Sequence, residues 1–332
     1  MNLCLIGCGA VARLHSRVAR SLGRQVALLY ASRTREKAEA YNRRFGGRGA
    51  FGSYEAACAS PDVDAVLICT PHALHVEHTR LAAAHKKPML IEKPVARTLG
   101  ELAEIEAAAG ESGAPCMVAE NYFFKPVVRV LQDHLQRGDI GDAVFIEVNR
   151  TNRNRVEGWR ADAGMMGGGA LLEGGVHWVN LMVSLGGDVH AVLAARPEAR
   201  LVAPFEDSLA VVFKFASGAV GRLLHSWNLL NRLRGLQGSK IYGTAGNILF
   251  ESNGLFVLVA GRRRRLRFPG VLDLMGYREM LRHFLGCVRE GRAPAMSLAV
   301  ARRDLAVVLA AYRSLESERF ERPRTVLAAP RV

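Results

Sequence analysis

The chain has 332 residues, 49% of them hydrophobic, which is enough for two domains with substantial cores. Its net charge of +14 includes a basic run, Arg262-Arg263-Arg264-Arg265-Leu266-Arg267. No RNA-binding or zinc-finger pattern accompanies that run, so we interpret it as a solvated strand or hairpin edge rather than a nucleic-acid site. No apolar run could span a bilayer, and the six cysteines form no C-x-x-C pair. We therefore expect a cytoplasmic protein without a membrane or nucleic-acid partner.

Strands and helices alternate over the first 120 residues. The predicted strands are Leu3–Ile6, Val26–Tyr30, Ala65–Cys69, Met89–Ile91 and Cys116–Ala119. The predicted helices are Ala10–Leu22, Arg35–Phe45, Ala73–Ala84 and Leu99–Ala109. This alternation is typical of βαβ units, so the pattern predicts a doubly wound parallel sheet, an α/β Rossmann domain over residues 1–121.

The pattern changes after Asn121. We expect a helix at Pro126–Gln136, a strand at Ala143–Arg150, a polar loop and a glycine-led helix over 168–186. Strands then follow at Val189–Ala194, Ser208–Phe215, Ala219–Ser226, Ser239–Gly243, Asn247–Glu251 and Gly254–Val259, and helices near Met275–Glu290 and Leu298–Leu315. Short turns between strands favour an antiparallel sheet. We therefore predict a second, α+β domain over residues 122–332.

A glycine motif opens the first predicted helix. The segment Gly7-Cys8-Gly9-Ala10-Val11-Ala12 has the form G-x-G-x-x-A and lies between a strand and a helix. Its glycines allow a tight turn and a close approach of the backbone to a pyrophosphate. The motif therefore predicts a dinucleotide site.

The end of the second strand bears on which dinucleotide binds. An NAD site needs a carboxylate there for the ribose 2′-hydroxyl, but the chain has Tyr30-Ala31-Ser32-Arg33-Thr34-Arg35. Ser32 and Arg33 could instead hold a 2′-phosphate, so we favour NADP over NAD. In the alternative interpretation Ser32 caps a helix and Arg33 is solvated.

Two further segments follow core strands of the first domain. Thr70-Pro71-His72-Ala73-Leu74-His75 precedes His78, but no acid or thiol completes a ligand set, so we predict no metal. Lys93 follows the strand Met89–Ile91 at the edge where open parallel sheets bind ligands. A lysine there can polarise a substrate oxygen.

Glu173 and His177 stand four residues apart on the glycine-led helix. This spacing places a carboxylate and an imidazole on one helical face. An unperturbed imidazole titrates near neutral pH, which suits a residue that takes or returns a hydroxyl proton.

In combination these residues resemble the Gfo/Idh/MocA oxidoreductase family. The matching segments, in chain order, are Gly7-x-Gly9-x-x-Ala12, Thr70-Pro71 with His75, Glu92-Lys93-Pro94, Ala119-Glu120-Asn121-Tyr122, Gly158-Trp159-Arg160 and Gly167-Gly168-Gly169-x-Leu171-x-Glu173-x-Gly175-x-His177. The resemblance implies an N-terminal Rossmann domain and a C-terminal domain with an open, mainly antiparallel sheet that often forms an oligomer interface. It also implies hydride transfer at a hydroxyl or carbonyl carbon of a sugar, cyclitol or related compound.

The resemblance further implies the roles of single residues. Lys93 matches the family's catalytic lysine and His177 its acid/base histidine, while Glu173 and Asn180 stand where aspartate and another acid are common. The positions expected at the cofactor are Gly7, Gly9, Ala10, Val11, Ala12, Ser32, Arg33, Thr70, Pro71, His75, Glu92, Lys93 and Asn121. Those expected at the substrate are Lys93, Tyr122, Arg153, Trp159, Arg160, Glu173 and His177.

The expected protein is therefore an NAD(P)-dependent dehydrogenase or reductase that forms a dimer or tetramer. His177 exchanges the hydroxyl proton, Lys93 polarises the same oxygen, and Glu173 orients His177 or binds a neighbouring hydroxyl. Two alternatives stay open: a lyase or hydrolase that retains its cofactor, and a regulatory protein that senses the dinucleotide without catalysis.

Overall fold

The computed structural model describes residues 1–154, 156–198, 205–229 and 236–325, which form two compact units. The first unit comprises Met1–Glu120 and Tyr277–Ala301. The second comprises Asn121–Gly276 and the described residues from Arg302 onward. The sequence predicted one boundary after residue 121, so the placement of Tyr277–Ala301 in the first unit differs from that prediction.

Two contacts explain why this late segment joins the first unit. The ring of Tyr277 meets His15 edge-on, with 5.6 Å between the ring centroids. The backbone N–H of Val118 donates a hydrogen bond to the carbonyl of Met296 over 3.1 Å. The segment therefore packs against a helix and extends a strand end of the dinucleotide-binding unit.

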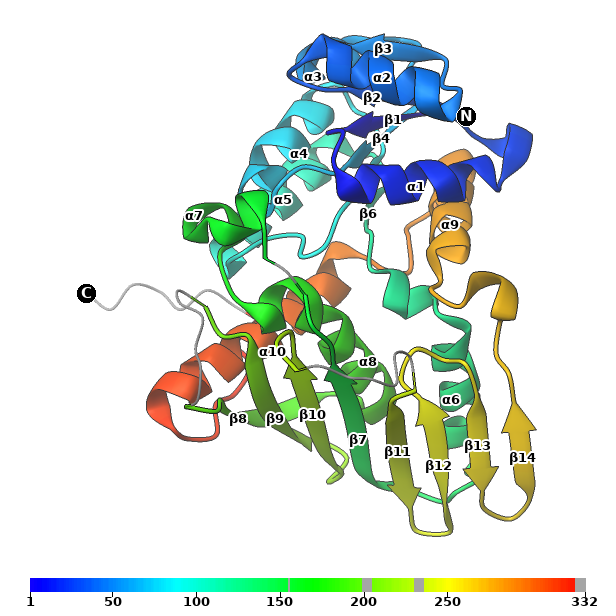
Figure 1. The fold of residues 1–332 in the computed structure, drawn as a ribbon, viewed down its shortest axis with the longest axis vertical. Coiled ribbons are helices and arrows are strands. Elements are labelled where there is room, and N and C mark those ends of the chain that lie inside the picture. The colour runs from blue at the N-terminus through cyan, green and yellow to red at the C-terminus, as the bar shows by residue number, and fades with distance from the viewer. Residues whose placement is uncertain (155, 199–204, 230–235, 326–332) are drawn as a thin grey trace. The chain divides into compact units, whose positions relative to one another are not determined.

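The first unit contains a parallel sheet of six strands in the order β3-β2-β1-β4-β5-β6 (Figure 1). Its strands are β1 (Asn2–Ile6), β2 (Ala27–Ala31), β3 (Gly49–Phe51), β4 (Ala65–Ile68), β5 (Met89–Ile91) and β6 (Cys116–Val118). The central strands β1 and β4 are almost fully buried, as their continuous apolar runs predicted. The predicted doubly wound parallel fold is confirmed, although the short edge strand β3 was not expected.

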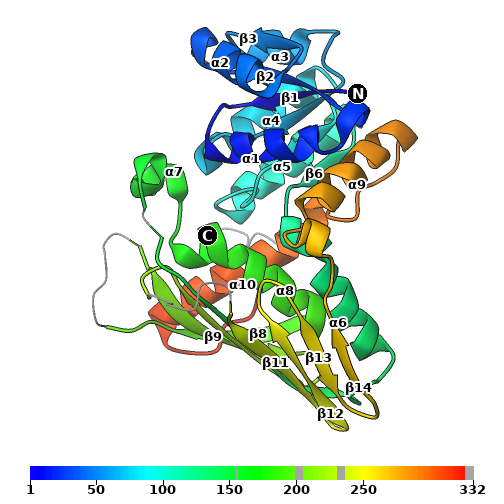
Figure 2. The same cartoon turned by 45° about the vertical axis from the view of Figure 1, so that its right-hand side comes forward.

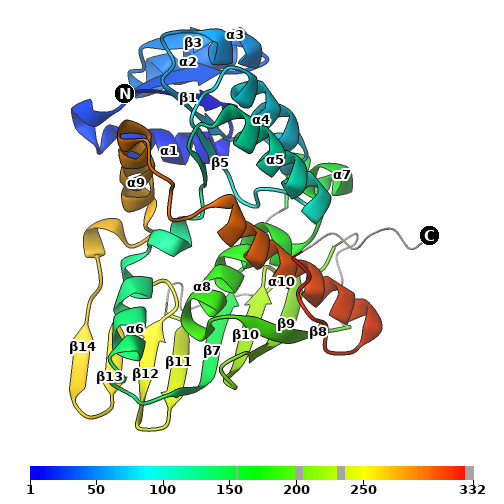
Figure 3. The same cartoon turned by 180° about the vertical axis from the view of Figure 1, so that it is seen from behind.

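Helices cover both faces of this sheet. The α-helices are α1 (Ala10–Arg20), α2 (Arg35–Phe45), α3 (Tyr54–Ala59), α4 (His75–Ala84), α5 (Leu99–Ser112) and α9 (Tyr277–Glu290), with 3₁₀ turns η1 (Gly23–Gln25) and η2 (His72–Leu74). Helix α1 packs against α2 and α9, whereas α4 packs against α3 and α5. Figures 1 and 3 show these two groups on opposite faces.

The second unit is built on a mainly antiparallel sheet in the order β14-β13-β12-β11-β7-β10-β9-β8. Its strands are β7 (Ala143–Thr151), β8 (Val189–Ala195), β9 (Ser208–Phe215), β10 (Val220–Ser226), β11 (Gly238–Gly243), β12 (Gly246–Glu251), β13 (Val257–Ala260) and β14 (Arg264–Arg267). Strands β7 and β10 are parallel, and the other pairs are antiparallel. The predicted open sheet is confirmed, and the arginine run forms its edge strand β14.

One face of this sheet carries helices. They are α6 (Pro126–Gln136), α8 (Val176–Gly186) and α10 (Leu298–Ser317). The connections contain shorter elements: the helix α7 (Ala163–Met166), the π-helical turn η5 (Leu171–Gly175) and the 3₁₀ turns η3 (Asn121–Phe124), η4 (Gly158–Ala161) and η6 (Val271–Asp273). Figures 2 and 3 show α6, α8 and α10 on the same side, and no helix of the described chain covers the other side. Helix α10 begins in the first unit and continues in the second.

None of the described helices combines the length and the apolar content that crossing a bilayer requires.

Candidate active site

The glycine loop after β1 is shaped to receive a phosphate group. Gly7 has a φ of +99°, and a Cβ added there would lie 3.0 Å from Cγ2 of Thr70. Gly9 has no neighbouring atom within 4 Å of the position of its missing Cβ, so its backbone borders open space. Helix α1 begins at Ala10 without an acidic residue in its first turn. A pyrophosphate would meet exposed N–H groups and the positive end of the helix, so these residues fit NAD(P).

The body of helix α1 is fixed to the sheet below the loop. Val11 is half-buried and Ala12 fully buried, and Nε2 of His15 lies 2.5 Å from Oε1 of Glu92. Burial alone would raise the pKa of Glu92, but the hydrogen bond and charge of His15, together with Lys93, hold this pKa below its ordinary value. The other oxygen, Oε2, accepts a hydrogen bond from the backbone N–H of Lys93 over 3.1 Å. Glu92 therefore ties the end of β5 to α1.

Lys93 follows directly after this buried carboxylate, at the carboxyl end of β5. Its side chain is half-buried, and the peptide bond to Pro94 is cis. The carboxyl ends of the strands are the edge at which parallel sheets of this kind bind ligands. Lys93 therefore lies at this edge of the sheet, and its place near the nicotinamide stays a prediction.

The end of β2 presents positive charge. Ser32 is buried, and its Oγ accepts a hydrogen bond from the backbone N–H of Thr34 over 3.3 Å, while Arg33 is exposed. Burial raises the pKa of Tyr54, and the charge and hydrogen bonds of Arg33 oppose that rise. Burial also lowers the pKa of His78 to about 4, with Arg33 among the lesser causes. Arg33 therefore lies close to both rings.

The loop after β4 is braced by histidines. Oγ1 of Thr70 lies 2.9 Å from Nδ1 of His78, and Pro71 beside it is half-buried. His75 is fully buried, with its ring nitrogens 3.0 Å and 3.1 Å from the carbonyl oxygens of Thr70 and Val95. Because the backbone occupies both nitrogens, we assign His75 to bracing this loop instead of direct cofactor contact. No group of three or more His, Cys, Asp or Glu residues in the described ranges is placed to hold a metal ion.

Asn121 begins the second unit and fixes the turn that carries Tyr122. Its Nδ2 donates a hydrogen bond to the carbonyl of Met275 over 2.7 Å. A Cβ at Gly276 would lie 2.5 Å from the carbonyl oxygen of Asn121, so only glycine lets these two segments touch. The side chain of Asn121 is buried and serves this contact.

His177 is held by an aromatic stack. The ring of Tyr122 lies 4.4 Å from its imidazole, centroid to centroid, with 13° between the planes. Since the imidazole covers one face of Tyr122, the Lys125 ammonium, 4.1 Å from the same centroid, occupies the other. Trp178 meets Tyr122 edge-on at 4.9 Å. His177 itself is half-buried, so it is restrained without being fully enclosed.

The expected glycine-led helix begins with a π-helical turn, Leu171–Gly175, before α8. A Cβ at Gly174 would lie 3.0 Å from Nε1 of Trp227, and one at Gly175 would lie 3.4 Å from Cδ2 of His225. Gly174 therefore lets Trp227, which follows β10, pack closely on the turn, whereas the nearest neighbour of a Cβ at Gly175 would be Cδ1 of Leu171, 2.8 Å away within the turn itself. Single π turns of this kind are frequent at functional sites, and this one carries Glu173.

The start of this turn is capped by buried polar groups. Oε1 of Glu206 accepts hydrogen bonds from the backbone N–H of Leu171 at 2.9 Å and from the hydroxyl of Tyr312 at 3.0 Å. The same hydroxyl accepts from the N–H groups of Gly169 and Leu172, each at 3.1 Å. A carboxylate at the start of a helix stabilises it through the orphan N–H groups and the helix dipole.

The predicted substrate residues Trp159, Arg160 and Glu173 come together. Nε of Arg160 donates a hydrogen bond to Oε1 of Glu173 over 2.9 Å, and its guanidinium lies 4.5 Å from the centroid of the Trp159 ring. Arg153 is exposed, and its backbone forms an isolated bridge with Asn228. Within the described residues, the side chain of Arg153 thus makes no hydrogen bond or ion pair with this group.

His225 was not predicted from the sequence, although it lies beside the candidate catalytic residues. Burial lowers its pKa to about 4, and the positive charge of Arg150 adds to the shift. Glu173 raises this pKa and His177 lowers it, so both side chains lie within electrostatic reach of the ring. A neutral imidazole therefore lies between β10 and α8. The alternation along β10 places His225 on the face of the buried Leu223, but nothing in the sequence indicated that Glu173 and His177 would be its neighbours.

Asn180, which by the family resemblance stands where an acid is common, is paired with an acid. It is completely buried, and its Nδ2 donates a hydrogen bond to Oδ2 of Asp304 over 2.6 Å. Asp304 lies on α10 and is itself buried. A buried carboxylate from another helix thus lies against Asn180.

Two family models match the chain in order. The model described as an oxidoreductase family with an NAD-binding Rossmann fold matches residues 1–120, and the GFO/IDH/MocA C-terminal domain matches residues 128–249. The chain belongs to the Gfo/Idh/MocA oxidoreductase family. Membership in Gfo/Idh/MocA places the chain among NAD(P)-dependent oxidoreductases.

Some of the curated relatives in Gfo/Idh/MocA are named as enzymes of sugars or sugar derivatives, whereas others are named for carboxylated compounds or for no substrate. Levoglucosan dehydrogenase of Pseudarthrobacter phenanthrenivorans is 27% identical over 76% of this chain and 73% of its own. The 1,5-anhydro-D-fructose reductase of Ensifer adhaerens is 26% identical over 74% of each chain. Among solved structures, levoglucosan dehydrogenase in complex with NADH superposes with a TM-score of 0.88 over 98% of this chain and 100% of that one, at 23% identity. That structural likeness shows the shared fold.

Proposed function

We propose that this protein transfers a hydride between NADP and a hydroxyl-bearing carbon of a sugar, cyclitol or related small polar compound. The observation that carries the proposal is the setting of His177, an imidazole that is stacked on Tyr122, half-buried and, like Glu173, within electrostatic reach of His225. A restrained imidazole can take the hydroxyl proton during oxidation and return it during reduction. A protein that only sensed the dinucleotide would need no such group.

Each remaining residue has a role in the proposed reaction. Lys93 polarises the substrate oxygen, and Glu173, held by Arg160, binds a neighbouring hydroxyl. The nicotinamide supplies the hydride chemistry when bound, and the glycine loop and α1 hold its pyrophosphate. No specific observation favours the lyase, hydrolase or sensor alternatives.

NADP is proposed over NAD because the end of β2 offers Ser32 and Arg33 and no carboxylate. A guanidinium binds a 2′-phosphate with a fork of N–H groups, whereas it offers little to a 2′-hydroxyl. We expect fluorescence titration to show tighter binding of NADPH than of NADH, and Arg33→Ala to remove that preference.

We also propose a homo-oligomer, a dimer or tetramer, formed through the helix-free face of the large sheet. The cross-strand pair Phe145 and Tyr242 is 50% and 37% exposed on that face, and Leu266 is 55% exposed farther along. Large apolar side chains left exposed on a sheet face often mark a protein interface. Light scattering that gives the mass of one chain would contradict it. The six unpaired cysteines support a reduced compartment such as the cytoplasm.

The test of the reaction is turnover of NADP⁺ and NADPH with a panel of aldoses, ketoses and cyclitols. We expect Lys93→Met and His177→Ala to lower kcat by at least about 100-fold while NADPH affinity stays within about 2-fold, because they act on the proton and the oxygen but not on the dinucleotide. Wild-type rates in both variants would reject these assignments.

A further inference from the structure

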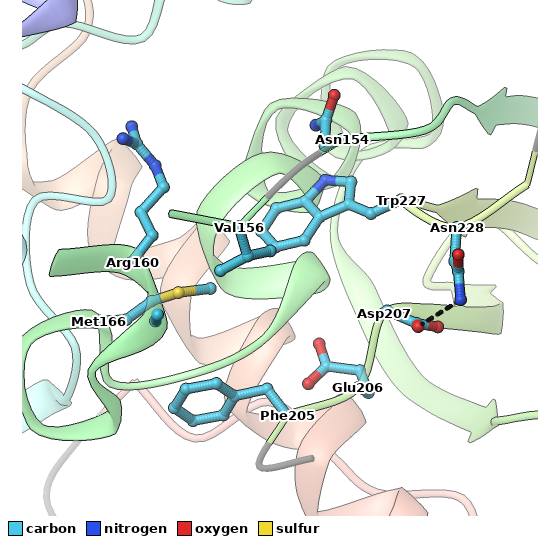
Figure 4. Close-up of a pocket in the computed structure, with 10 residues that line it drawn as sticks. Asn154, Val156, Arg160, Met166, Phe205, Glu206, Asp207, Trp227 and Asn228 are labelled. Atoms are coloured by element: carbon cyan, nitrogen blue, oxygen red, sulfur yellow. Dashed lines mark hydrogen bonds between the residues drawn. The ribbon is translucent and has the colours of Figure 1, made fainter. Parts of the chain in front are cut away.

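A pocket of about 250 Å³ lies inside the second unit, and Arg160 is one of the residues that line it (Figure 4). Nε of this arginine donates the hydrogen bond to Glu173. Its inner surface is apolar, formed by Met166 and Trp227, with Phe205 packed beside them. The reaction proposed above assigns no role to this pocket, since His177 and Glu173 do not line it.

Polar groups stand around this apolar surface. Asp207 lines the pocket, and its Oδ2 accepts a hydrogen bond from Nδ2 of Asn228 over 3.0 Å, as Figure 4 shows. The buried carboxylate of Glu206 lies beside it, with Oε1 already engaged in capping. Arg160 also lines the pocket, but its charge is paired with Glu173, so the two carboxylates disfavour an anionic ligand. The apolar floor disfavours a small cation. The lining therefore suits a neutral ligand that has both an apolar face and hydroxyl groups.

A sugar ring has this character. Its C–H face packs on an aromatic plane, and its hydroxyls donate hydrogen bonds to carboxylates and exchange them with amides. The volume is below the range of about 300–1,000 Å³ that is typical for drug-sized ligands, so it fits a single ring. Arg160 connects the pocket with the candidate active site, because it lines the pocket and its Nε donates a hydrogen bond to Glu173 over 2.9 Å.

We propose that this pocket is a second sugar subsite, which takes a neutral ring joined to the one that is oxidised or reduced. The preferred substrates would then be disaccharides or glycosides rather than free monosaccharides. The inference rests on the proposed function, since it adds a subsite to the same reaction.

The test compares kcat/KM for maltose, cellobiose and lactose with the values for glucose and galactose, using NADP⁺. We expect kcat/KM for the best disaccharide to be about 10-fold higher than for its monosaccharides, because the second ring adds about one ring contact and one hydrogen bond. Ala161→Trp places an indole in the pocket from an exposed lining position. It should lower kcat/KM about 10-fold more for the disaccharide than for the monosaccharide.

Ala163→Trp is the matched control, because Ala163 is exposed on the neighbouring helix α7 and does not line the pocket. This control should keep the wild-type ratio. If Ala161→Trp fails to fold, Asn228→Ala removes an exposed amide of the rim and should raise KM for the disaccharide selectively.

The outcomes separate the two proposals. Turnover of no sugar by the wild type would reject the proposed function and the subsite with it. Turnover of monosaccharides with no gain from a second ring, and equal effects of Ala161→Trp on both classes, would overturn the subsite and leave the oxidoreductase assignment intact.

Discussion

Tyr122 stacks on the imidazole of His177 at 4.4 Å with 13° between the planes. The Lys125 ammonium, 4.1 Å from the centroid of the Tyr122 ring, fixes the aromatic ring from its other face. The candidate acid/base residue is thus oriented by a residue from a different segment of the second unit. A rotamer that is locked by packing places its nitrogen more reproducibly than one free to rotate.

Removing this stack should lower the rate more than it lowers cofactor binding. We expect Tyr122→Leu to reduce kcat by about 10-fold, because an aromatic pair of this kind contributes about 0.5–1.5 kcal/mol and also sets the ring orientation. Tyr122→Phe retains the stack and should keep kcat within about 2-fold. Steady-state kinetics with NADPH titration measures both effects, and an equal loss in the two variants would point to the hydroxyl instead.

The cap on the π turn gives a stability prediction. A Cβ at Gly169 would lie within 2.3 Å of both the side chain and the backbone oxygen of Glu206. Gly169→Ala should therefore displace the capping carboxylate and lower the free energy of unfolding by about 1–3 kcal/mol.

Gly110 in helix α5 provides the control for this experiment. No atom lies within 4 Å of the position that its Cβ would take. Gly110→Ala should stabilise the protein by about 0.5–1 kcal/mol, because alanine is the better helix former. Urea unfolding of both variants gives the comparison. A stable Gly169→Ala would show that Glu206 can move without cost.

The first unit was largely predictable because its signals are local. Continuous apolar strands, helices between them and the turn at Gly7 and Gly9 are each read within a few residues. The strand β3 was not predicted because it consists of only Gly49–Phe51, three half-buried residues at the edge of the sheet. The placement of Tyr277–Ala301 in this unit was not predicted because it depends on contacts between residues far apart in the chain, such as Tyr277 and His15.

The candidate site was predicted only in part, because it too depends on contacts between residues far apart in the chain. The positions of Glu173 and His177 follow from spacing, but the partners that restrain or neighbour them do not. His225 is brought to the π turn by the pairing of β10 with β7, and Asp304 meets Asn180 through the packing of α10 on α8. Long-range pairs leave no pattern in a single sequence.

The pair of Asn180 and Asp304 should contribute measurably to stability. Asn180→Ala removes the donor that lies 2.6 Å from Oδ2 of Asp304, in a region where both residues are buried. A buried carboxylate that loses a hydrogen bond costs about 1–3 kcal/mol. Asn247→Ala, at an exposed position of β12, should change the free energy of unfolding by no more than about 0.5 kcal/mol. Similar changes in the free energy of unfolding for the two variants would show that the pair does not stabilise the fold.

His225 should make the stability of the protein depend on pH. Burial lowers its pKa in the folded state to about 4, whereas an unfolded histidine titrates near pH 6.5. Between these two values the unfolded chain binds a proton that the folded chain does not, so stability must fall as the pH decreases. The contribution is fully present above about pH 6.5 and is lost progressively down to about pH 4.

The measurement is urea unfolding of the wild type and of His225→Gln at pH 7 and pH 5. The wild type should lose about 2 kcal/mol more than the variant over this interval, because glutamine cannot take up the proton. His190→Gln is the control, since His190 is exposed on β8 and should leave the wild-type pH dependence unchanged. An equal loss in wild type and His225→Gln would mean that the folded state accepts a proton at His225 near pH 6.5. His225 would then carry a positive charge in the folded protein below about pH 6.5, within electrostatic reach of Glu173 and His177.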